Sequence, residues 1–141
     1  MLLGTKLLGE QQSAASTLAA AALEVLTCAE PLGKCGLTYR HAAAWRSGQL
    51  TAVGQAAAPE RPARPARPLL RQPRDMPRRK LGKDPAGRIA LLHALAHIEL
   101  NAVDLAWDII VRFSDEALPR GYYDDWLSVA QLRSLIPDLD T

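Results

Sequence analysis

The segment from about Pro85 to Phe113 has apolar residues at the spacing of one long α-helix. A helix turns by roughly 100° per residue, so residues three and four apart lie on the same face. This spacing predicts a buried seam that is flanked by Ala96, Val103 and Ile110. The seam itself consists of Leu92, Leu95, Glu99, Ala102, Ala106, Ile109 and Phe113. The opposite face is polar, and it carries His93, His97, Asn101, Asp104, Asp108 and Arg112.

Glu99 is the only charged residue in the predicted apolar seam. Burying an unpaired carboxylate costs several kcal/mol, so the side chain must be neutralised, paired or bound to a metal. The pattern alone gives similar weight to a structural role, with an arginine as partner, and to metal binding or catalysis.

His93 and His97 suggest a second kind of site on the polar face. Two histidines four residues apart on a helix can bind one zinc ion, with Asp104 further along the same face. However, Ala94 follows His93, where a metalloprotease helix would need glutamate, and Glu99 lies roughly 160° round the helix from His97. We therefore favour a solvated or loop-facing polar surface over a zinc site.

Three more helices and one extended segment are expected. Residues 13–29 read as a helix, and a second helix runs from Pro31, a favoured first helical residue, to Gly48. A last helix begins near Tyr122, forms a hairpin with the long helix, and ends at Pro137. With almost no strand signal, the pattern predicts an all-α fold.

Residues 59–84 are rich in arginine and proline, and they should form an extended strap. Four prolines recur every third residue from Pro59 to Pro68, which is the period of polyproline II, so no helix or strand is expected over 61–80. Residues 60–83 contain nine Lys or Arg and two acids, whereas the remaining residues are net negative. Spaced arginines can bind nucleic-acid phosphates. Because no aromatic residues are interleaved for base stacking, a strap across the helices is favoured.

The bulk properties of the chain agree with a single domain. The chain has 141 residues, and Cys28 and Cys35 lack the spacing of a metal site, so reduced thiols in a cytoplasmic protein are expected. The first residues lack a secretory signal, and we expect no apolar run to approach membrane-spanning length. The expected divisions are a disordered 1–12, a helical pair at 13–58, the strap at 59–84, and a helical hairpin at 85–141.

Several stretches resemble a bacterial family of ferritin-like proteins known as domain of unknown function 455. They include "LTCAEPLGKCGLTYRHAAAWRSGQL", "RPARPARPLL", "PRDMPRR" and "YYDDWLSVA". The most specific is "LLHALAHIELNAVDLAWD". The resemblance implies a four-helix bundle in which glutamates and Glu-x-x-His pairs hold two metal ions. It also implies that Glu99 corresponds to the single glutamate of the first bundle helix.

The resemblance also implies that the metal site is incomplete. No Glu or His follows Glu116, so the Glu-x-x-His motif expected of the next helix is missing. We therefore expect a partial, truncated ferritin-like bundle with Glu99 as a single residual ligand and no cofactor of its own. Di-iron or di-manganese is expected only in a complete family member.

Three functions follow from these observations. The first is a truncated, non-catalytic ferritin-like protein, in which Glu99 is solvated or paired with an arginine. The second is a di-metal oxidoreductase when the bundle is complete, and the third is a nucleic-acid-binding module using the strap. For the first, we expect no membrane or nucleic-acid partner, and possible self-association through an incompletely covered seam. That seam comprises Leu92, Leu95, Ala102, Ala106 and Phe113.

Overall fold

The computed structural model describes residues 15–65 and 85–135, and over these residues all regular secondary structure is α-helix. The helices are α2 (Leu18–Thr27), α3 (Pro31–Arg46), α4 (Pro85–Arg112) and α5 (Arg120–Arg133). The expected all-α class is confirmed for this part of the chain. The expected disorder of 1–12, the C-terminal stop at Pro137, and most of the arginine-proline segment lie outside the described residues.

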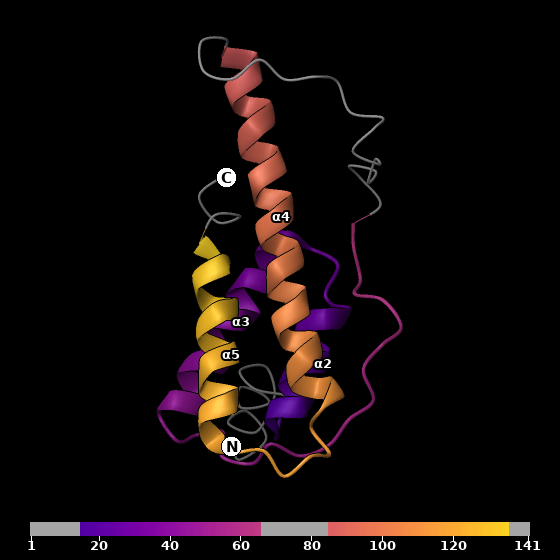
Figure 1. Ribbon diagram of the computed structural model, residues 1–141, viewed down its shortest axis with the longest axis vertical. Coiled ribbons are helices and arrows are strands. Elements are labelled where there is room, and N and C mark those ends of the chain that lie inside the picture. The colour runs from indigo at the N-terminus through magenta and orange to yellow at the C-terminus, as the bar shows by residue number, and fades with distance from the viewer. Residues whose placement is uncertain (1–14, 66–84, 136–141) are drawn as a thin grey trace, which may run out of the picture.

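The four helices form a ring of neighbours (Figure 1). α4 contacts α5 and α2, and α3 contacts α2 and α5, so α3 and α4 occupy opposite corners. The short turn between α4 and α5 makes the predicted hairpin. α5 covers only the C-terminal half of α4, and the N-terminal half of α4 extends beyond the other helices.

The ends of α3 and α4 lie close to the predicted ones, whereas α2 is shorter than the helix predicted at 13–29, and local chemistry explains the differences. α2 begins at Leu18 because the Thr17 hydroxyl accepts a hydrogen bond from the Ala20 amide at 3.1 Å. It ends at Thr27, since the residues before Pro31 are biased away from helical backbone angles. α3 ends at Arg46, and Gly48 follows with a φ of 83°, as expected of a stop signal.

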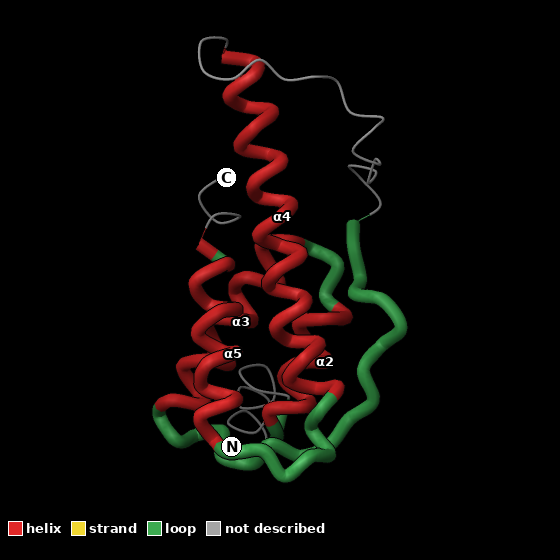
Figure 2. The backbone as a smooth tube through the Cα atoms, viewed as in Figure 1, coloured by secondary structure: helices red, strands yellow, loops and turns green. Residues whose placement is uncertain are grey.

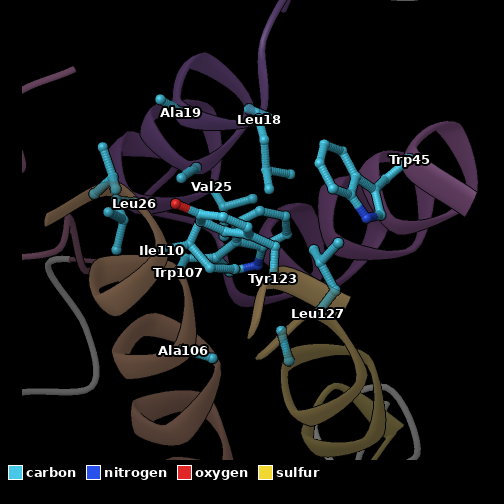
Figure 3. Close-up of a cluster of buried hydrophobic side chains, with 14 of the residues drawn as sticks. Leu18, Ala19, Val25, Leu26, Trp45, Ala106, Trp107, Ile110, Tyr123 and Leu127 are labelled. Carbon is cyan, nitrogen blue, oxygen red and sulfur yellow. The ribbon is translucent and has the colours of Figure 1, made fainter. Parts of the chain in front are cut away.

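The core lies where α2, α3, α4 and α5 meet (Figure 3). Trp45, Trp107 and Tyr123 are each at most 1 % exposed, and small residues between them allow the helices to approach closely. The smaller members of this core include Leu18, Ala19, Ala22, Val25, Leu26, Ala106, Ile110 and Leu127.

The segment between α3 and α4 acts as a strap along α2 over its described part (Figure 2). The amides of Leu18 and Ala19, which have no partner inside the helix, donate to the carbonyls of Ala52 and Val53 at 2.9 and 2.8 Å. At the other end of α2, the Ala63 amide donates to the Leu26 carbonyl at 2.7 Å. Residues 59–65, the described start of the predicted strap, contain neither helix nor strand, and the course of the rest of the strap stays a prediction.

Gly54 fixes the path of this strap over the start of α2. Its φ is 68°, and a Cβ atom there would lie 2.7 Å from the side chain of Thr17. We expect Gly54→Ala to lower the free energy of unfolding by about 1–3 kcal/mol, because the backbone conformation and the contact are both unfavourable for alanine.

Gly36→Ala is the matched control for this substitution. Gly36 lies inside α3 with nothing within 4 Å of the added atom, so alanine should be neutral or stabilising by up to about 1 kcal/mol. Urea denaturation followed by circular dichroism measures both changes. Equal stabilities of the two variants would contradict the role assigned to Gly54.

Candidate functional site

Glu99 faces α5 and is paired with an arginine. Its side chain is largely buried, at 8 % exposure, and Nη1 of Arg133 donates to its two carboxylate oxygens at 3.3 and 3.2 Å. Arg133 lies in the last turn of α5 and is about half exposed. Glu99 is thus paired with an arginine, which was one of the expected outcomes. The pattern of α4 alone could not identify Arg133 as the partner, because this arginine lies on α5.

Asp104 is the more deeply buried carboxylate of α4. The helical pattern placed it on a polar face that should be solvated or face a loop, and at 2 % exposure the solvated alternative is wrong for Asp104. Its Oδ1 accepts a hydrogen bond from Lys34 Nζ at 2.9 Å, and its Oδ2 lies 2.7 Å from Arg64 Nη2. A basic residue from α3 and another from the strap cover this face of α4, so its polarity was no guide to exposure.

Lys34 is completely buried in the centre of this cluster. Besides Asp104, its ammonium group donates to the carbonyls of Val25 at 3.0 Å and Leu26 at 3.4 Å. These carbonyls end α2, where the helix dipole favours a positive charge. Burial raises the pKa of the Asp104 carboxyl above its ordinary value of 3.8, and the hydrogen bond and charge of Lys34, followed by those of Arg64, oppose that rise. We call Lys34, Arg64 and Asp104 the buried charge cluster.

A second group of polar side chains continues from the cluster toward α2. Trp107 Nε1 donates to the Thr38 hydroxyl at 2.9 Å, and that hydroxyl donates to the Lys34 carbonyl at 2.8 Å. Beside them, His41 Nε2 lies 2.7 Å from the Glu24 carboxylate, and its ring meets the edge of Trp107. The buried polar groups of α3 therefore connect α2 to α4 across the bundle.

The side chains that were weighed as a zinc site on the polar face of α4 do not converge. His93 is exposed and His97 is half-buried, whereas Asp104 belongs to the buried charge cluster. Within 15–65 and 85–135, no three His, Cys, Asp or Glu side chains are close enough together to hold a metal ion. Asn101, on the same face, accepts a hydrogen bond from Arg64 Nη2 at 2.6 Å.

The face of α4 that packs against the bundle differs from the predicted seam. Leu92, Leu95 and Phe113 are 53, 38 and 43 % exposed, as predicted, and Ala102 is half-buried. The prediction was wrong for Ala106, which is 1 % exposed. The face in contact with the bundle is rotated toward Val103, Asp104, Trp107, Ile110 and Val111, because α2 and the charge cluster lie on that side.

The expectation that no segment approaches membrane-spanning length also needs correction. Among the described residues, one helix, α4, is long and apolar enough to cross a membrane, with a mean hydropathy of 1.4 over its most apolar window. Core helices of soluble proteins pass the same test, so length and composition are weak evidence for a membrane span. Only 28 % of that window is buried in the fold.

Several residues of the site carried no usable sequence signal. Lys34, Thr38, His41 and Trp45 lie on the buried face of α3, but three of the four are polar, and apolar periodicity therefore misses that face. Arg64 belonged to a regular repeat with Arg61 and Arg67, and nothing in the repeat marked it as the one that binds Asp104. A regular repeat does not reveal which member meets a partner.

The fold and the site define an all-helical protein with a strap fixed by a buried charge cluster. Residues 27–133 match the family described as "Protein of unknown function (DUF455)", and the chain belongs to that family. It is similar to a protein of Haemophilus influenzae described as "Uncharacterized protein", with 43 % identity over 84 residues. The match covers 56 % of this chain and 27 % of the relative, so the chain spans about a quarter of that protein's length. No solved structure matches the chain.

Proposed function

We propose that this chain is a non-catalytic helical unit of the ferritin-like type, in which Glu99 is paired with Arg133 between α4 and α5 and has no metal role. The observation that supports this most is the pairing of Glu99 with Arg133. A guanidinium group within 3.3 Å of both carboxylate oxygens repels a cation from the same position. The ferritin-like relation itself rests on the resemblance of the α4 sequence, and truncation of a longer bundle stays a prediction.

The described residues do not fit a two-metal centre. Such a centre takes several carboxylates and histidines, and a single carboxylate cannot hold two ions against water. Glu99 has a cation beside it and no grouped Asp, Glu, His or Cys side chains in the described part of the chain. A di-iron or di-manganese site would therefore need ligands from outside these residues.

A di-metal oxidoreductase is the second candidate, and the exposure of Arg133 is the observation that favours it. Because the arginine side chain is 49 % exposed, it can turn into solvent and release Glu99. Complete family members would then use the same carboxylate as one ligand.

The third candidate is a nucleic-acid-binding strap. Arg64 of the strap is paired with Asp104 and is therefore not free to bind a phosphate, whereas Arg61 is exposed.

Glu99→Leu tests the proposed structural role. We expect the free energy of unfolding to stay within about 1 kcal/mol of the parent chain or to rise, because an apolar side chain replaces a charge whose partner is half solvated. Thermal and urea unfolding give the measurement, and Glu99→Gln separates the loss of charge from the change in shape. Loss of folding in the leucine variant would contradict the proposal.

Metal retention distinguishes the two leading candidates. The purified chain is mixed with iron(II) or manganese(II), desalted and analysed for metal by mass spectrometry, in parallel with Arg133→Ala and Glu99→Gln. We expect no stoichiometric metal in any of the three proteins. Stoichiometric metal that is lost in Glu99→Gln would establish the di-metal candidate instead.

A further inference from the structure

α4 carries a second apolar face that the bundle does not use. Its residues recur at alternating intervals of four and three, which keeps them on one side of the helix. We call this set the α4 stripe, and it consists of Leu91, Leu95, Ile98, Ala102, Leu105 and Ile109. An unbroken apolar line along one side of a helix is typical of a face that packs against another helix.

The α4 stripe faces away from the bundle. Ile98 and Leu105 are 58 and 57 % exposed, Leu95 is 38 % exposed, and the other three members are half-buried. At roughly 100° per residue, the stripe lies about 140° round the helix from the buried face that includes Val103 and Trp107. α2, α5 and the strap occupy the other sides, so the described part of the chain leaves the stripe uncovered (Figure 1).

We propose that the α4 stripe binds the α4 stripe of a second copy of this chain, which makes a symmetric dimer. The stripe contains no charged residue, so pairing two of them buries no unpaired charge, and Ala102 near its centre lets two helices approach closely. Complete burial of the partly exposed side chains of two stripes would remove at most on the order of 1,000 Å², which is about the least that a specific interface needs. An apolar patch of roughly half that area on each copy matches the largest patch on a typical monomer, and such patches often serve an interaction.

The surroundings of the stripe favour a protein partner over a lipid surface. Asp108 and Arg112 are paired with each other at 2.9 Å, and they lie beside the stripe together with exposed Asn101. Charged groups that flank a narrow apolar line suit the rim of a helix pair. A bilayer would have to accommodate the same charges at considerable cost. The proposed dimer is independent of any metal role of Glu99.

Molar mass in solution tests the dimer. The full chain is examined by size-exclusion chromatography with light scattering and by sedimentation velocity, from low micromolar concentration upward. We expect a dimer mass for the parent chain. For the double variant Ile98→Glu/Leu105→Glu we expect a dissociation constant at least tenfold weaker, with an unchanged helical circular dichroism spectrum. Both side chains are more than half exposed, and the milder Leu105→Asn serves if the double variant is unfolded.

Leu132→Glu is the matched control. Leu132 is 61 % exposed on α5 and is not part of the α4 stripe, so its variant should dimerise like the parent chain. A parent chain that stays monomeric at the highest concentration would overturn the proposal, and so would a folded stripe variant that still dimerises. Binding of the parent chain to phosphatidylcholine–phosphatidylglycerol vesicles through the stripe, without dimer formation in solution, would also overturn it.

Discussion

Asp104→Ala is expected to lower the free energy of unfolding by about 3–5 kcal/mol. The substitution removes the carboxylate that lies within 2.9 Å of Lys34 and Arg64. Lys34 is fully buried, so its ammonium group would keep only the two carbonyl partners at the end of α2. Domains are stable by only about 5–15 kcal/mol, and this loss is therefore a large part of the total.

A double-mutant cycle separates the cost of the orphaned charge from the value of the pair. Lys34→Met should cost less than Asp104→Ala, because Arg64 still neutralises the remaining carboxylate. Lys34→Met combined with Asp104→Ala should be more stable than Asp104→Ala alone, since the double variant no longer buries an unpaired lysine charge. Chemical denaturation followed by circular dichroism measures each corner of the cycle.

Asp108→Ala is the control on the same helix. Asp108 is half-buried and bonds to exposed Arg112 one turn away, an arrangement that contributes roughly 0.3–0.5 kcal/mol. The buried charge cluster would lose its assigned role if Asp104→Ala and Asp108→Ala were equally mild, or if the cycle showed no coupling between Lys34 and Asp104.

Trp107→Ala is expected to destabilise the fold by a similar amount, about 3–5 kcal/mol, because it empties a large volume at the centre of the core. Trp107 is fully buried, and its indole Nε1 donates to the Thr38 hydroxyl. Thr38→Val keeps the volume but removes that acceptor, so it should cost about 1–3 kcal/mol through the unsatisfied donor. The melting temperature and the urea midpoint measure both variants.

Trp126→Ala provides the comparison for the tryptophan. Trp126 is half-buried and packs against the outside of the same core, so its truncation should cost clearly less than that of Trp107. If both alanine variants lost the same stability, the centre of the core would not lie at Trp107, where its indole donates to Thr38 of α3.

The sequence by itself determined the helices and the character of the strap. Apolar spacing identified α4 almost to the residue, and Pro31 and Gly48 marked α3 within two residues. Proline at every third position predicts a segment without helix or strand, and the described residues 59–65 contain neither. These features depend on neighbours a few residues away, through backbone angles and hydrogen bonds, so a single sequence contains the information.

The tertiary structure alone decided which polar groups are buried and with what partners. Asp104 and Glu99 are both acids on α4, and only the approach of Lys34, Arg64 and Arg133 determines how each is paired. Helical periodicity placed Asp104 on a solvated or loop-facing surface because it assumes that a buried face is apolar. That assumption fails where basic side chains from α3, α5 and the strap meet α4, because a charge can be buried when it is paired. The partners lie at least 34 residues away in the sequence, so a local pattern cannot identify them.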